Sequence, residues 1–173
     1  MDKKKTAHEQ KQLISKLPVK PRKLAKEELE KEIIQFISRG KICTLATCTD
    51  NIPRATPVHY LNKGMTLYVF AESGGKLKNL KKNPNISLGI HGPYKDFLSV
   101  KGLQIWGRAE IIYQKERVRF AELKEMYEKE WRRDITSMDV GGIPAIMKVI
   151  KITVEKARYL NVQKGIINQT WKA

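Results

Sequence analysis

Short segments of alternating apolar and polar residues, separated by tight-turn sequences, constrain the fold of this chain more than any other feature. Asp50-Asn51 and Asn62-Lys63-Gly64 are turn sequences, and each lies between two segments rich in strand-forming residues. The predicted strands cover residues 42–49, 53–61, 65–72, 85–92, 101–112 and 145–162, and the last is one bent strand or two joined strands. An open sheet of this size would leave unpaired edges, which closure removes. The sequence therefore predicts a mainly β (α+β) fold, a small antiparallel barrel.

Two amphipathic helices are predicted on the outside of this barrel, with a short third one between strands. The segment KEELEKEIIQFISRG spaces its apolar residues three and four apart, as a helix requires, and Gly40 follows its end. Residues 115–132 show the same spacing, with Phe120 and Leu123 in the apolar stripe. The segment LKNLKKN holds good helix formers until Pro84 stops them. The apolar stripes predict packing against a core.

Positive charge is concentrated at the start of the 173-residue chain. The formal net charge is +16, and residues 1–26 hold nine Lys and Arg against Asp2 and Glu9, which is +7. This segment contains Pro18 and Pro21 but no sustained apolar period, so we expect a mobile basic arm. Residues 27–173 have the length and composition of one domain. The basic balance makes phosphate-bearing ligands or nucleic acid candidate partners.

The cysteine, histidine and hydropathy patterns argue against several classes of site. Cys43 and Cys48 lie on opposite faces of one predicted strand, beyond the reach of a disulfide, so we expect reduced thiols. The three histidines are scattered without metal-ligand spacing, which predicts no metal site. No segment is apolar over the length of a membrane span, and the first residues lack the apolar core of a signal peptide. We therefore expect a cytoplasmic protein that makes no membrane contact.

The sequence AESGGKLKNLKKNPN, residues 71–85, follows a predicted strand and combines two glycines with four lysines. Glycines let backbone N–H groups approach a ligand, and Lys76 adds a positive charge, so the segment suits a phosphate group. It is not a Walker A loop, because Gly74-Gly75-Lys76 is followed by Leu77 rather than by Ser or Thr. Nucleotide hydrolysis is therefore not indicated, and an exposed turn stays the alternative to an anion site.

Three pieces of the sequence carry a resemblance to a known family. They are PRATPV (53–58), Lys76 with the following Asn-Leu and Asn-Pro pairs, and GRAE (107–110). In order and spacing, residues 27–162 resemble the pyridoxamine 5′-phosphate oxidase-like family of FMN-binding split barrels. The resemblance implies a six-stranded antiparallel split β-barrel with two or three flanking helices. It also implies a homodimer with FMN at the subunit interface.

The resemblance further implies a cofactor site. In that family the strand matching 54–59 lies along the flavin ring with its Arg near the phosphate, and the end of the next strand touches the cofactor. Gly75 and Lys76 match phosphate-binding positions, although the first is commonly basic, and Ser73 lies next to a position that often holds Ser. A Gln that meets the flavin has its nearest match in Gln104. The implied cofactor-binding residues are Arg54, Ala55, Thr56, Pro57, Val58, His59, Phe70, Ala71, Ser73, Gly75, Lys76 and Gln104.

The expected function is that of an FMN-dependent oxidoreductase with an unidentified substrate and unassigned catalytic residues. Vitamin B6 oxidation is not assigned, because the chain ends NQTWKA and lacks the Arg-Leu-x-Pro ending that helps to hold the substrate in true pyridoxamine 5′-phosphate oxidases. Alternatives are the same fold binding deazaflavin or haem, and a basic β-barrel that binds nucleic acid. Against nucleic acid, the predicted strands lack a cluster of exposed aromatic residues for base stacking.

Overall fold

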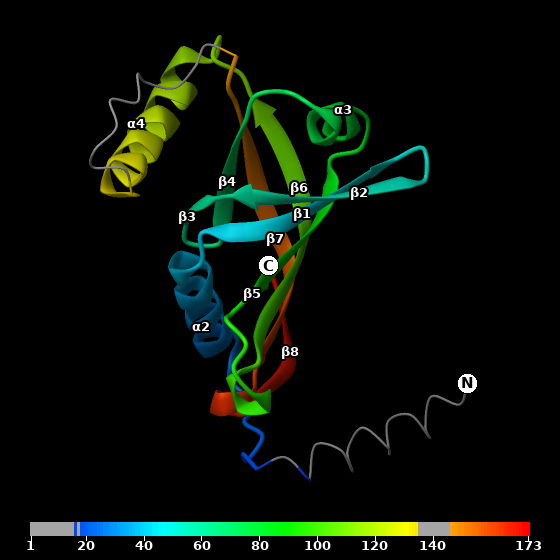
Figure 1. The fold of residues 1–173 in the computed structure, drawn as a ribbon, viewed down its shortest axis with the longest axis vertical. Helices are drawn as coiled ribbons and strands as arrows, with labels where there is room; N and C mark the ends of the chain where they lie inside the picture. The colour runs from blue at the N-terminus through cyan, green and yellow to red at the C-terminus, as the bar shows by residue number, and fades with distance from the viewer. Residues whose placement is uncertain (1–15, 17, 135–145) are drawn as a thin grey trace.

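The structure, a computed structural model, describes residue 16, residues 18–134 and residues 146–173. Within these ranges one antiparallel sheet forms the body of the molecule, and helices lie around it (Figure 1). The helices are α2 (Lys26–Arg39), α3 (Gly75–Lys82) and α4 (Arg117–Asp134), with short 3-10 helices η1 (Phe97–Ser99) and η2 (Val162–Lys164). The strands are β1 (Ile42–Thr49), β2 (Ile52–His59), β3 (Leu61–Lys63), β4 (Thr66–Ala71), β5 (Asn85–His91), β6 (Lys101–Ile112), β7 (Lys148–Asn161) and β8 (Ile166–Lys172).

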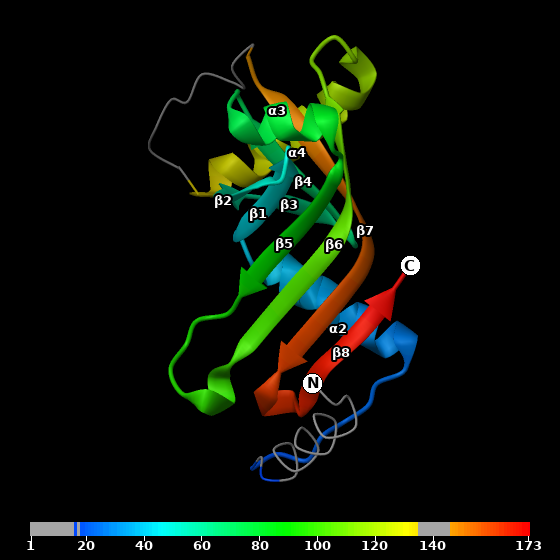
Figure 2. The same cartoon turned by 90° about the vertical axis from the view of Figure 1, so that its right-hand side faces the viewer.

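The strand order is β2-β1-β5-β6-β7-β4-β3, with β8 beside β7, and all the pairs are antiparallel. One side of β7 pairs with β6 along nearly its whole length. Its other side pairs first with β4 and then with β8. The long strands bend, so that the sheet curls into a half-barrel with three helices against it (Figure 2). The predicted α+β split-barrel fold is confirmed.

The described part of the chain has eight strands where the sequence predicted six. The predicted strand 53–61 divides at Tyr60, whose backbone N–H donates to the carbonyl of Lys41 at 2.9 Å. The sequence also left β8 unassigned, because its Asn-Gln-Thr centre interrupts the apolar alternation and Asn168 has a φ of 50°. The predicted loop 134–144 lies, apart from its first residue, outside the described residues.

A bulge at Gly107 allows β6 and β7 to bend together. The register of the two strands shifts between Trp106 and Gly107. A Cβ atom at Gly107 would overlap the backbone carbonyl of Thr153, so any side chain here would push the strands apart. The φ of Gly107 lies outside the left-handed region, so its backbone conformation does not require glycine. The close approach to Thr153 does.

Helix α2 packs its apolar stripe against the sheet. Leu29, Ile33 and Ile37 are buried in the main core, as the sequence predicted. Phe36 contacts Tyr159 of β7, with ring centroids 5.4 Å apart. These contacts bury one face of the helix, and this burial is the main source of its stability.

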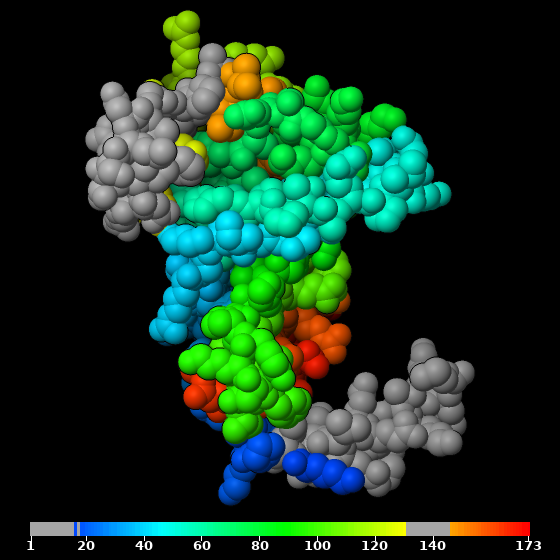
Figure 3. Space-filling model, viewed as in Figure 1, coloured from blue at the N-terminus to red at the C-terminus, as the bar shows by residue number. Residues whose placement is uncertain are grey.

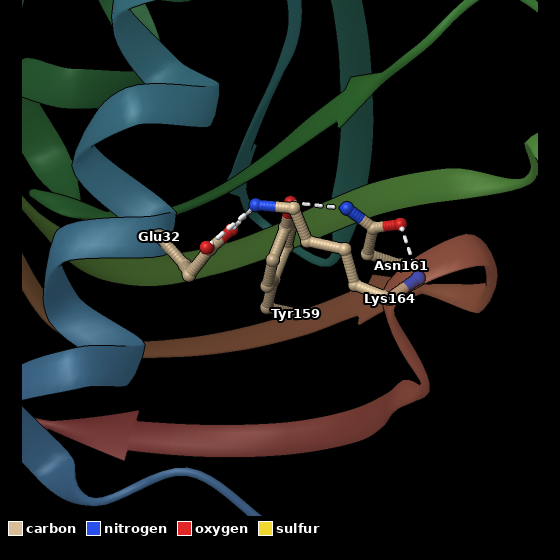
Figure 4. Close-up of polar contacts among 4 residues, drawn as sticks. All are labelled: Glu32, Tyr159, Asn161 and Lys164. Carbon is tan, nitrogen blue, oxygen red and sulfur yellow. Dashed lines mark hydrogen bonds and ion pairs between the residues drawn. The ribbon is translucent and has the colours of Figure 1, made fainter. Parts of the chain in front are cut away.

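A polar cluster fastens α2 to the turn between β7 and β8 (Figure 4). Both carboxylate oxygens of Glu32 lie 2.6–2.7 Å from Nζ of Lys164. Asn161 is buried, and its amide donates to the Tyr159 hydroxyl at 3.2 Å while its oxygen accepts from the Lys164 backbone N–H at 3.3 Å. Burial raises the pKa of Tyr159. The buried polar groups are therefore paired, and the turn is held in one conformation.

The segment that leads into α2 lies against β8. The backbone N–H of Arg22 donates to the Gly165 carbonyl at 2.8 Å, and the N–H of Leu24 donates to Oε1 of Gln169 at 3.0 Å. The Gln169 amide nitrogen donates in turn to the Arg22 carbonyl. Residues 1–15 and 17 of the predicted basic arm lie outside the described residues. The arm's boundary at residue 26 stays a prediction.

Two classes of feature are missing from the described ranges. No helix there combines the length and apolar character needed to span a membrane. No group of three or more His, Cys, Asp or Glu side chains there is arranged to hold a metal ion. Cys43 is buried, Cys48 is half-buried, and both thiols are free.

The Tyr60 hydroxyl connects the junction between β2 and β3 to the end of α2, and its removal should lower stability. Tyr60 is 1% exposed, and its hydroxyl donates to the Ile37 carbonyl at 2.7 Å. We expect Tyr60→Phe to lower the free energy of unfolding by about 1 kcal/mol, because the Gly40 N–H still reaches that carbonyl at 3.1 Å. Urea unfolding measures the change, with Tyr94→Phe as the exposed control. Equal midpoints for Tyr60→Phe and wild type would contradict this role.

Candidate functional site

The N-terminal end of α3 forms the centre of the candidate site. Gly74 precedes the helix with a φ of 115°, which glycine adopts without strain. As the N-cap residue it has no side chain, so no side-chain hydrogen bond caps the first backbone N–H groups of α3. A Cβ atom at Gly75 would overlap the guanidinium of Arg54, so the missing side chain makes room for Arg54 against the first helical turn. No carboxylate within the described ranges forms an ion pair with Arg54 or Lys76. Two cations and a positive helix end therefore lie together.

The four lysines of this segment differ in their surroundings. Lys76 is half-buried in the first turn of α3. Lys78, Lys81 and Lys82 are exposed, and Lys82 pairs with Asp50 at 3.1 Å. Lys76 is thus the lysine of α3 that lies nearest in sequence to Gly75 and is the least surrounded by water.

Two asparagines and two leucines hold α3 in place. Asn79 is buried, and its amide donates to Oγ1 of Thr47 at 3.1 Å. The Asn83 amide donates to the Cys48 carbonyl at 3.0 Å, and both leucines of the helix are buried in the core. In the sequence, both asparagines stand out only as part of the family resemblance. Their role in fixing the helix on β1 depends on a partner strand that is distant in sequence.

The segment 55–59, predicted to line a cofactor ring, belongs to an edge strand. β2 lies at one end of the strand order and pairs with β1 alone. Its residues alternate between positions opposite buried residues of β1 (Arg54, Thr56 and Val58) and positions opposite more exposed ones (Ala55, Pro57 and His59). A flat ligand along this edge would therefore meet backbone groups as well as side chains of either set.

The end of β4 leads directly into the candidate site. Ala71 is buried in the core, and Ser73 is exposed in the turn before α3. Phe70 packs against Tyr127 of α4 with ring centroids 4.3 Å apart, in a second apolar cluster around Phe120. The ring of Phe70 is thus packed against α4. A cofactor contact from this position would come from its backbone.

Gln104 lies apart from the other predicted residues. It is exposed on β6, where it pairs with Gly89 on one side and with Arg158 on the other. Three strand spacings separate β6 from β2 in the sheet, which is roughly 14 Å. Within one chain the structure does not bring Gln104 to Arg54 and Lys76. Near Gln104, the ammonium of Lys156 lies 4.5 Å from the ring centre of Trp106, a pair that no sequence pattern indicated.

The pKa shifts of Cys43 and Glu110 show that neither group offers a reactive acid or base at neutral pH. Burial raises the pKa of the Cys43 thiol to about 12, so this thiol on β1 stays protonated and unreactive at neutral pH. The hydrogen bond from Arg119 lowers the pKa of Glu110 on β6, which keeps that carboxylate ionised. The groups left to act at the candidate site are cations, backbone N–H groups and a free strand edge. This combination suits a ligand with a phosphate and a flat polar ring.

Comparison with known proteins agrees with this architecture. The sequence profile described as pyridoxamine 5′-phosphate oxidase matches residues 29–161. A pyridoxamine 5′-phosphate oxidase homolog from Saccharomyces cerevisiae is 23% identical over 144 residues, which cover 72% of this chain and 67% of that protein. An uncharacterized protein from Rhizobium meliloti is 35% identical over 54 residues, and the match spans only 36% of its length and 31% of this chain.

A solved structure supports the fold independently. The crystal structure of an FAD-binding protein from Mesorhizobium loti has a TM-score of 0.59 and 20% identity to this chain, covering 79% of this chain and 94% of that one. At this identity the likeness concerns the fold alone. The profile match extends over most of the chain, from α2 to the end of β7. The chain therefore belongs to the pyridoxamine 5′-phosphate oxidase family.

Proposed function

We propose that this protein binds FMN, with the phosphate held by Arg54 and Lys76 at the N-terminal end of α3. The observation that carries the proposal is the position of the Arg54 guanidinium against Gly75, where a side chain would displace it. Two positive side chains and the uncapped helix end match the charge of a phosphate dianion. Ser73 in the exposed turn adds a hydroxyl beside this end. The membership of a family with flavin-binding relatives supports the same cofactor.

The ring of the flavin would lie along the free edge of β2. Residues 55–59 offer backbone donors and acceptors there, and the backbone at Phe70 and Ala71 lies where β4 enters the site. A bound flavin supplies electron transfer, for which the protein side chains have no equivalent. The role of this chain's residues is to bind, orient and partly dehydrate the cofactor. The proposed activity is therefore that of a flavin-dependent oxidoreductase, with a substrate still to be identified.

A second copy of the chain would complete the site. Gln104 is separated from Arg54 by three strand spacings, and it lies on an exposed part of the sheet. A flavin on β2 of one copy can meet Gln104 of another if the two exposed faces approach each other. Interfaces of this kind bury ligands that one small barrel cannot enclose. We therefore propose a homodimer with the cofactor between the subunits.

The absorption spectrum of the purified protein tests the cofactor class. We expect flavin bands, or their appearance with a bound-state shift when FMN is added to the apoprotein. Deazaflavin and haem have different bands, and a nucleic-acid complex absorbs near 260 nm without any visible band. Parallel titrations with FMN and FAD decide between the two flavins. A colourless protein that ignores excess FMN would overturn the proposal.

Lys76 should matter for FMN and not for riboflavin. Removing one charge-assisted contact to the phosphate costs about 1.5–3 kcal/mol, which is about a ten-fold to hundred-fold loss of affinity for Lys76→Ala. Riboflavin has no phosphate and should bind the variant and the wild type alike. Lys81→Ala, on the exposed side of α3, is the matched control and should change FMN affinity little. Fluorescence titration gives all the affinities, and equal losses for both variants would indicate only a diffuse positive field.

Dimerisation should be visible in solution. Light scattering of the FMN-loaded protein should give about twice the 19.9 kDa mass of the chain. Gln104→Ala should weaken FMN binding without changing this mass, because the side chain reaches the cofactor and is not needed for the interface as a whole. A monomeric mass at micromolar concentration with FMN bound would contradict the proposed dimer.

A further inference from the structure

A groove separate from the candidate flavin site lies between β8 and the segment that leads into α2. It has a volume of about 800 Å³. One wall is formed by residues 21–24 with Lys26 and Leu29 of α2, and the other by Gly165, Ile167 and residues 169–173. Leu24, Leu29, Ile167 and Trp171 provide apolar surface, and Leu29 and Trp171 are buried. The Trp171 indole N–H donates to Glu30 at 2.8 Å, which fixes the ring. The groove is therefore a preformed feature with an apolar floor.

Positive side chains surround this floor. Arg22, Lys23, Lys26 and Lys172 line the groove, and all four are exposed. The ammonium of Lys26 lies 5.7 Å from the centre of the Trp171 ring. None of the described side chains that line the groove is acidic. A ligand that carries negative charge beside apolar groups is complementary to this arrangement.

The last residues of β8 also present an unpaired strand edge to the groove. In antiparallel strands, successive residues direct their N–H and C=O groups to opposite sides. The Ala173 N–H donates to the Glu155 carbonyl of β7 at 3.0 Å, so the backbone groups of Lys172 and Thr170 face away from β7. Upstream, the Gln169 amide already bridges β8 to the backbone of residues 22–24. Beyond Leu24 the chain turns into α2, and no described segment continues this pairing along residues 170–173.

We propose that this groove binds an extended acidic segment of a partner protein by strand addition to β8. Main-chain hydrogen bonds to Thr170 and Lys172 would give the affinity, and alternate side chains of the peptide would reach the apolar floor. The four cations select acidic residues between those apolar ones. The four residues 170–173 span roughly 13 Å of strand, enough for four or five peptide residues. The proposal does not depend on flavin binding, since the groove shares no residue with the candidate flavin site.

A fluorescein-labelled hexapeptide of alternating glutamate and valine is the probe, titrated into the full chain by fluorescence anisotropy. We expect saturable binding, and slower hydrogen exchange at the amides of Thr170 and Lys172 when the peptide is bound. The double variant Lys26→Glu/Lys172→Glu should weaken binding at least ten-fold. The control Lys63→Glu/Lys95→Glu makes the same charge change at exposed lysines elsewhere and should weaken binding less than two-fold. Equal weakening by both variants would overturn the proposal, because it would mean attraction to the overall charge.

Backbone-methylated peptides test strand addition without any change to the protein. One version is N-methylated at its three valines and the other at its three glutamates. A peptide strand directs alternate N–H groups to opposite sides, so at least one version must lose its hydrogen bonds to β8 and its binding. If both versions bind as the parent peptide does, the groove recognises charge and side chains alone, and strand addition is wrong. Failure to bind any acidic peptide, with normal FMN binding, would overturn this inference and leave the proposed function standing.

Discussion

The close approach of β6 to β7 at Gly107 is the constraint on which the rest of the architecture depends. The Gly107 backbone lies against the Thr153 carbonyl, and the register shifts there, so both long strands bend at the same point. Beyond the bend, the free side of β7 changes partner, from β4 in its first half to β8 in its second. One bulge thus divides the sheet into an end that carries α3 and α4 and an end that carries α2. The space-filling view shows the end with β2 and α3 as the broader of the two (Figure 3).

At the end that carries α3, the fold brings two cations of a strongly basic chain to one helix end. The chain has 34 Lys and Arg, and most of those in the described ranges are exposed, so that water and salt screen their fields. Arg54 lies against Gly75 at the first turn of α3, Lys76 belongs to that turn, and Asn79 and the buried leucines fix the helix on β1. Cations at the N-terminal end of a helix add to the positive potential of that end. The net charge of +16 indicates affinity for anions in general, and the proposed phosphate site rests on the positions of these two cations.

The free edges of β2 and β8, at the two ends of the sheet, differ in how far other segments cover them. The edge of β2 is open beside α3, where the proposed cofactor would lie. The edge of β8 is covered at its start by residues 22–24 through the Gln169 amide, and it is open only towards its end. Free edges invite pairing with other chains, so native proteins usually cover or use them. Both open stretches lie beside cations, which disfavours unspecific pairing with like-charged copies.

The sequence by itself determined the strand segments, the two long helices and the family pattern of residues 53–58 and 107–110, because alternation, helical spacing and turn residues are local properties. It assigned Arg54 and Lys76 to one phosphate only through the resemblance, and the tertiary structure brings Arg54 to Gly75. It did not predict β8, whose polar centre forms a strand only because β7 offers it a ladder. Nor could it show that Phe70 faces α4 or that Gln104 lies three strands from Arg54. The face and the neighbours of a strand residue are set by register with strands distant in sequence, and only the folded sheet decides that register.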